Sequence, residues 1–313
     1  MSATVSVHVG APTKPTIDTE RGHRIRMRLL YLVAIVSNLA IFFYGFDYYK
    51  LSAVDRPFSP KHHLLRPSGP VGLYLGFVGV ALFIGIFLYP LRKHWAWLGQ
   101  IGKTRRWLDI HVLMGLTAPF IIAFHSTFKF SGIAGMAFWI MFAVSVSGVI
   151  GRYLYAQIPR RVTTVELSMR ELQELQENLW EQLASQDLLP EADLRSLLRM
   201  PSERWARRLP IPIALIYMVI LDILRKFGVA RLRRHASGQF FATFFGFLPT
   251  KHQEIEQAVQ AAAEEAALSK RLLFLSRSQK VFHLWHVIHK PFSYAFAVLA
   301  MMHIGLQFVL GYF

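Results

Sequence analysis

The chain has 313 residues, a formal charge of +16, 53% hydrophobic residues and no cysteine. The lack of cysteine excludes disulfides, Cys-ligated zinc, Cys-ligated iron–sulfur clusters and covalently attached c-type haem. Long apolar runs recur, which indicates an integral membrane protein. We therefore interpret the basic residues as loop charges that face anionic lipid, and expect no nucleic-acid partner.

In chain order, the first expected element is a basic arm, 1–28, which ends in four arginines. Four membrane spans are then expected within 29–156, with approximate bounds 29–46, 71–91, 107–128 and 134–155. The loop between the first two spans contains four prolines, which interrupt helices. The first apolar run is followed by no obvious cleavage site, so we expect it to be an uncleaved span.

A hydrophilic insertion, 157–281, follows the fourth span, and we expect it to be mostly helical. Its segments 162–186 and 251–273 have helical patterns. Its segment 211–225 is apolar but too short to cross a bilayer, which predicts an interfacial or buried helix. The last expected domain is 282–313, which contains a fifth span at about 285–310.

The distribution of Lys and Arg predicts the orientation of the spans. All strongly basic segments fall on one side if the N-terminus is cytoplasmic and five spans are present. This arrangement places the insertion in the cytoplasm and makes the third and fifth spans run in the same direction. We therefore expect an all-α bundle of five spans in the cytoplasmic (inner) membrane of a bacterium.

Four histidines have a distinctive placement in these two parallel spans. His111 and His125 lie 14 residues apart in the third span, and His289 and His303 lie 14 apart in the fifth. In an α-helix, 14 residues return a side chain to within about 40° of the same face, roughly 21 Å along the axis. Facing helices would therefore bring the histidines together in two tiers, an inner tier (His111 and His289) and an outer tier (His125 and His303).

A single histidine in a span is often only a hydrogen-bonded packing residue. Two pairs with equal spacing at matching depths instead favour paired metal ligands, because ionisable groups in lipid are costly and usually functional. Each tier offers two opposed imidazoles, as a six-coordinate haem requires.

This histidine pattern resembles the dihaem core of b-type cytochromes, as in the cytochrome b of quinol–cytochrome c reductases and the membrane domain of ferric reductases and NADPH oxidases. The resemblance covers spans two to five and rests mainly on the four histidines. It implies two b-type haems, one with His111 and His289 as axial ligands and one with His125 and His303. Unlike the oxidases, this sequence shows no flavin- or NAD-binding domain after the fifth span, and a long insertion separates the fourth and fifth spans.

Other residues are candidates for contacts with the haems. Gly115 lies one turn after His111 and could give a porphyrin face room, although ordinary helix packing explains a glycine equally well. Cationic partners for propionates are expected among Arg105, Arg106, Arg152 and Lys290 on the inner side and Lys129 on the outer side, although charge bias in the loops also explains them. His286 competes with His289 as a ligand, but its spacing from His303 places it about 100° away from that face.

These observations predict transmembrane electron transfer, between a quinone pool or cytoplasmic donor and a partner across the membrane. The chain would then be the cytochrome b subunit of an oxidoreductase complex with redox partner subunits, and His94 or Asp109 could exchange protons with quinone. The sequence has no GxGxxG motif or P-loop, so NADH oxidation by the chain itself is not expected. Two alternatives stay open, a proton-coupled transporter that uses the intramembrane histidines and a membrane anchor or scaffold subunit.

Overall fold

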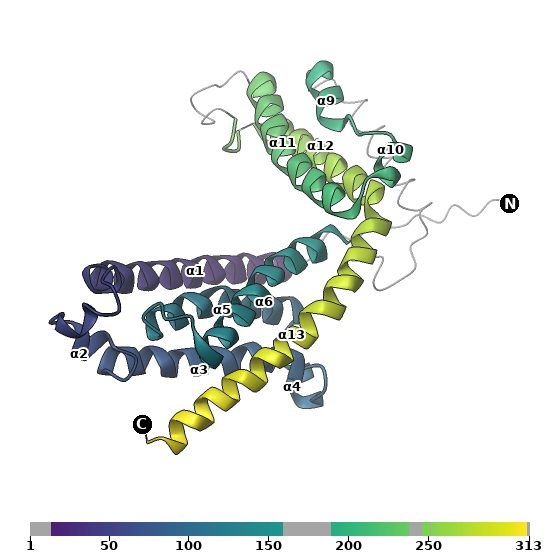
Figure 1. The fold of residues 1–313 in the computed structure, drawn as a ribbon. Coiled ribbons are helices and arrows are strands. Elements are labelled where there is room, and N and C mark those ends of the chain that lie inside the picture. Colours follow the sequence, from purple (N-terminus) through teal and green to yellow (C-terminus); the bar gives the residue numbers. More distant parts are fainter. Residues whose placement is uncertain (1–13, 159–188, 238–245, 251, 312–313) are drawn as a thin grey trace. The chain divides into compact units, whose positions relative to one another are not determined.

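A computed structural model describes residues 14–158, 189–237, 246–250 and 252–311 (Figure 1). This part of the chain contains helices and no strands, which confirms the all-α prediction. The chain divides into two compact units, one formed by Met1–Ile150 with Ile288–Phe313 and the other by Gly151–Val287. The predicted insertion lies within the second unit, and its expected helix at 162–186 falls outside the described residues.

Five helices are long and apolar enough to cross a membrane, as expected for an integral membrane protein. They are α1 (Lys14–Tyr49), α3 (Pro70–Leu91), α5 (Thr104–His125), α6 (Gly132–Gln157) and α13 (Leu275–Val309). The short elements between them are η1 (Arg56–Phe58), α2 (His62–Leu65) and α4 (Ala96–Gln100). Helix α13 begins ten residues before the predicted fifth span. The prediction missed these first turns because they are polar and do not extend the apolar run.

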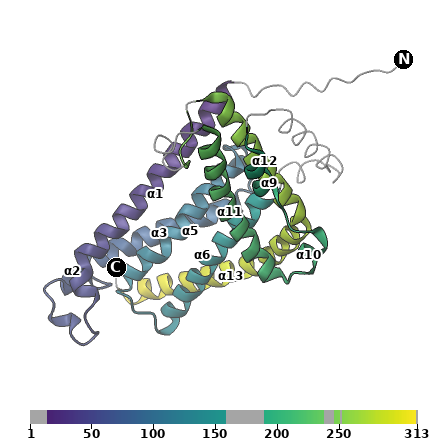
Figure 2. The same ribbon diagram turned by 90° about the horizontal axis from the view of Figure 1, so that it is seen from above.

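The first unit is packed most closely around α5. Helices α1, α3 and α5 lie side by side in both views (Figures 1 and 2). Glycines on α3 allow this approach, because a Cβ at Gly79 would lie 2.4 Å from Ile122 Cδ1 and one at Gly85 would lie 2.6 Å from Met114 Sδ. Among the described residues, α6 and α13 come close to the backbone of other helices at only a few isolated points. Accordingly, 33% of the most apolar stretch of α5 is buried, whereas none of that of α13 is buried.

The loop between α1 and α3 is fixed to the end of α5 by a buried arginine. The Arg56 guanidinium donates to the carbonyl oxygens of Tyr49 at 3.1 Å, Leu51 at 3.1 Å and Thr127 at 2.6 Å. Thr127 and Phe128 both have positive φ angles, 51° and 60°, which L-residues with side chains rarely adopt. Arg56 therefore holds the chain in an unfavourable conformation immediately after His125.

The second unit contains a small apolar core. In its described part lie α9 (Glu191–Leu198), α10 (Glu203–Arg208), α11 (Ile211–Ser237) and α12 (Gln253–Leu273), together with the end of α6 and the start of α13. Leu197, Leu232, Val259 and Ala262 are among the buried residues where α9, α11 and α12 meet. Helix α11 continues well beyond the predicted 211–225, since its last turns are basic and carry no apolar signal.

Two ion pairs join α11 to α12, one buried (Arg233 with Glu256) and one partly buried (Lys270 with Asp222). Arg233 donates to both carboxylate oxygens of Glu256 at 2.9 Å, and Lys270 lies 2.5 Å from Asp222. Burial alone would raise the pKa of Glu256, but hydrogen bonds from Arg233, Gln260 and the Thr250 N–H outweigh it and hold the pKa below its ordinary value. These pairs fix the relative register of the two helices.

Candidate functional site

The two histidines of α5 both bond to the backbone of α3. His111 Nδ1 lies 3.0 Å from the Ile86 carbonyl oxygen, and His125 Nδ1 lies 2.8 Å from the Gly72 carbonyl oxygen. A carbonyl oxygen only accepts hydrogen bonds, so each Nδ1 carries the proton. The Nε2 atom of each neutral ring then keeps its lone pair, which is the form of imidazole that binds a metal.

The sequence of α3 makes these contacts possible. In a regular helix the Ile86 carbonyl would accept from the N–H four residues later, but that residue is Pro90, which has no N–H. The Ile86 oxygen is thus available to His111. At the other end, Gly76 leaves room for the His125 ring, because a Cβ there would lie 2.9 Å from Cε1.

A proline also frees a backbone carbonyl for a side chain of a neighbouring helix between α5 and α6. Pro119 deprives the Gly115 carbonyl of its helical partner, and Ser145 of α6 donates to that carbonyl at 2.6 Å. The contact places this part of α6 at the depth of the inner end of α5, one turn from His111.

His289 of α13 is held at the same level by α6. Its Nδ1 lies 2.7 Å from Ser147 Oγ, and that hydroxyl donates its own proton to the Val144 carbonyl at 2.8 Å. Ser147 therefore accepts from Nδ1–H, which again leaves the lone pair on Nε2. Ser145 and Ser147 lie two residues apart on α6. One short stretch of α6 therefore contacts both α5, one turn after His111, and His289 of α13.

The outer tier would pair His125 of α5 with His303 of α13, whose side chain is half-buried. Each predicted tier thus has one histidine on α5 and one on α13. The pairing of His125 with His303 stays a prediction.

An aromatic residue lies midway between the tiers. Phe296 is seven residues from both His289 and His303, and Ala118 is seven from both His111 and His125. The two residues belong to one apolar cluster, where Phe296 also packs edge-on against Phe83 at 5.6 Å. This apolar cluster therefore includes one residue from each histidine-bearing helix, at the position midway between its two histidines.

His286, the alternative ligand, belongs to the second unit. Its Nδ1 donates to the Phe282 carbonyl of its own helix at 3.1 Å, and its ring packs edge-on against Phe282 and Trp285. These contacts are those of a packing histidine. The preference for His289 over it stays a prediction.

The other predicted haem contacts are dispersed. A Cβ at Gly115 would meet no atom within 4 Å, so there is open space beside this residue. Arg105 is exposed and lies 3.8 Å from Glu20. The remaining predicted partners of propionates differ in exposure: Lys129 and Lys290 are exposed, whereas Arg106 and Arg152 are half-buried. Arg152 lies in the second unit. The propionate role of all five cations stays a prediction.

Sequence reasoning missed a buried pair near the inner tier. His23 of α1 lies 3.0 Å from Asp109 of α5, and both side chains are largely buried. From the sequence, Asp109, two residues before His111, is expected only as a proton-exchange group for quinone. An acidic residue inside an apolar run was the available signal, but nothing in the sequence identified its partner. His94, the other such candidate, is exposed in the loop before α4.

The described residues contain no group of three or more His, Cys, Asp or Glu side chains suited to a metal ion. A haem iron with two axial histidines needs only two protein ligands, because the porphyrin supplies the other four. The fixed tautomers, the open space at Gly115 and the loose packing of α13 all fit such a group. No protein-family model, characterised protein or solved structure matches this chain.

Proposed function

We propose that the chain transfers electrons across a membrane through two b-type haems. His111 and His289 would hold the haem of the inner tier, and His125 and His303 that of the outer tier. The observation that carries the proposal is that three of these four histidines have Nδ1 bonded to an acceptor on a neighbouring helix. When bound, the haem iron would supply reversible one-electron chemistry at each tier.

The residues of the chain account for how such groups would be held. The acceptors at Ile86, Gly72 and Ser147 orient the imidazoles and raise the basicity of Nε2. Phe296 and Ala118, which belong to one apolar cluster midway between the histidines of their helices, would keep the region between the haems apolar. Arg105, Arg106 and Lys290 on one side, with Lys129 on the other, are candidates to neutralise propionates.

The proposal extends to the setting of the protein. The basic residues before α1 and between α3 and α5 favour a cytoplasmic N-terminus in a bacterial inner membrane. Electrons would pass between a quinone pool or cytoplasmic donor and a partner subunit on the other side, with the chain as the cytochrome b subunit of a complex.

A reduced-minus-oxidised visible spectrum of the purified protein, with a measured haem-to-protein ratio, tests the proposal. We expect a b-type spectrum and a ratio of two. His125→Ala and His303→Ala should each remove the same haem, and His111→Ala and His289→Ala should remove the other. His94→Ala, which replaces an exposed loop histidine, is the control and should keep both haems. A protein without a chromophore would overturn the proposal and favour the transporter alternative, in which the histidines relay protons.

A further inference from the structure

Helix α11 has a continuous exposed apolar face, although it is not one of the membrane-spanning helices. The face, which we call the α11 stripe, consists of Ile213, Ile216, Ile220, Ile223, Leu224 and Phe227. At 100° per residue these six positions fall within an arc of about 100°, and the stripe is about 21 Å long. Ile216 is 60% exposed and Phe227 is 58% exposed, whereas Ala214 and Met218 on the opposite face are almost fully buried.

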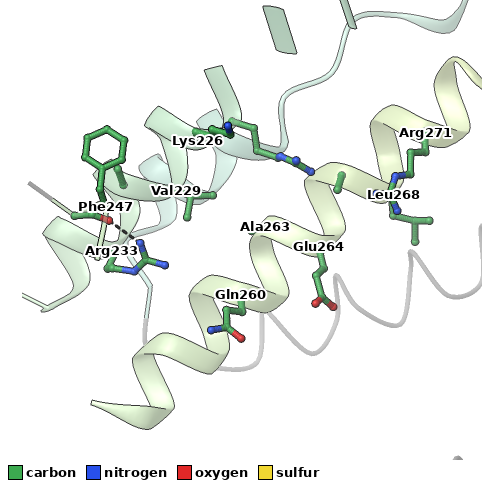
Figure 3. Close-up of a pocket in the computed structure, with 13 residues that line it drawn as sticks. Lys226, Val229, Arg233, Phe247, Gln260, Ala263, Glu264, Leu268 and Arg271 are labelled. Carbon is green, nitrogen blue, oxygen red and sulfur yellow. Dashed lines mark hydrogen bonds between the residues drawn. The ribbon is translucent and has the colours of Figure 1, made fainter. Parts of the chain in front are cut away.

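A basic groove lies beside the stripe, between α11 and α12 (Figure 3). Its volume is about 860 Å³. Four basic residues and one acidic residue are among those that line it: Arg225, Lys226, Arg233, Arg271 and Glu264. Figure 3 shows Arg233 and Phe247 toward one end and Arg271 toward the other. The groove therefore has the charge that attracts anions.

The cations of the groove are not equally available. Arg233 is engaged by Glu256 and by the Gly246 carbonyl, and Arg225 lies 3.4 Å from Asp222. Lys226 is exposed and forms no ion pair within the described part of the chain. It lies on the edge of α11 that separates the groove from the stripe, about 60° around the helix from Ile223.

The stripe and the groove share an aromatic border. Phe247 lines the groove and packs edge-on against Phe227, the last residue of the stripe, with ring centroids 5.8 Å apart. An anion in the groove would therefore lie next to apolar surface, and a ligand with an anionic head and apolar chains would match both.

We propose that this surface binds the membrane itself, with the α11 stripe in the apolar layer and an anionic phospholipid headgroup in the groove. The unit follows α6 and leads directly into α13, two helices able to span a membrane, so it is tethered at the membrane surface. A helix with one apolar face and flanking cations is the type that lies in the plane of an anionic interface. The proposal is independent of haem binding.

The absence of cysteine makes the first test direct, because a single introduced cysteine can carry a nitroxide label. The full chain would be placed in nanodiscs of phosphatidylcholine and phosphatidylglycerol, labelled at Ile220→Cys in the stripe or at Gln257→Cys, an exposed site on α12. We expect the label at 220 to collide more with oxygen than with a water-soluble nickel chelate, and the label at 257 to show the reverse. A label at 220 open to the chelate, or shielded from both reagents by protein, would overturn the proposal.

The second test addresses the headgroup. Native mass spectrometry would compare retention of phosphatidylglycerol and phosphatidylcholine by the parent protein and by Lys226→Gln/Arg271→Gln. Each cation near an anionic surface contributes about 1 kcal/mol, so the double variant should lose roughly 30-fold in preference for phosphatidylglycerol. Arg199→Gln/Arg204→Gln, two exposed arginines of the same unit outside the groove, is the matched control and should lose much less. Equal retention by both double variants would overturn the assignment of the groove.

Discussion

Ser147 provides the sharpest test of how the inner tier is built. Ser147→Ala removes the acceptor of His289 Nδ1–H, which lies 2.7 Å away, and leaves the histidine itself in place. A buried donor without a partner costs about 1–3 kcal/mol. Loss of such a supporting bond lowers metal affinity about 10–100-fold, which corresponds to about 1.4–2.8 kcal/mol. The two independent estimates agree, so we expect weaker binding of the inner haem by one to two orders of magnitude.

The assay is titration of the haem-depleted protein with haemin, followed by a redox titration that resolves the two centres. Ser145→Ala is the matched control, because Ser145 lies two residues away on α6 and bonds to Gly115 rather than to His289. Ser147→Thr keeps a hydroxyl and should restore much of the affinity. If Ser147→Ala binds haem as tightly as Ser145→Ala, with the same two potentials, the role assigned to Ser147 is refuted.

Three further predictions concern other parts of the structure. Gly76→Ala should displace the His125 ring and weaken only the outer haem, since the new Cβ would lie 2.9 Å from Cε1; Gly22→Ala, where a Cβ meets nothing within 4 Å, is the control in the same spectral assay. Arg56→Met should lower the free energy of unfolding by about 3 kcal/mol, because charged hydrogen bonds to three carbonyls are lost. Arg66→Met, which replaces an exposed arginine, is the control in thermal unfolding. The same melting temperature and steepness of unfolding in both variants would contradict the prediction. Glu256 has a folded-state pKa below its ordinary value of 4.5, so its stabilising contribution is complete above that pH and is lost as pH falls through the lower folded-state value. Glu256→Gln should remove this pH dependence and, by leaving Arg233 buried without its partner, lower the stability of the second unit by about 3–5 kcal/mol, as measured by urea unfolding between pH 3 and 7.

The sequence predicted the parts of the fold that depend on periodic apolar residues. The five spans were found because each is an uninterrupted apolar run, whereas the polar extensions of α11 and α13 give no such signal. The histidine spacing could also be interpreted from the sequence, because an α-helix turns by a fixed angle per residue and the spacing therefore determines which face each histidine lies on. Two of the three groups that orient the histidines are backbone carbonyls, which every residue possesses, so no side chain marks them in advance. For the Ile86 carbonyl, Pro90 was an available clue, because a proline inside a span frees the carbonyl four residues earlier. The Gly72 carbonyl had no such clue, since the residue four positions later is Gly76. Ser147 was visible only as a polar residue in an apolar helix.

The position of α13 after the helical unit has a consequence for biosynthesis. In the proposed arrangement each tier takes one histidine from α5 and one from α13, and about 160 residues separate His125 from His289 along the chain. At about 5–20 residues per second, a ribosome needs roughly 8–30 s to synthesise that interval. Throughout it, neither proposed haem site would have its second ligand. If the proposal holds, haem capture would wait until the membrane bundle and the helical unit have both been made.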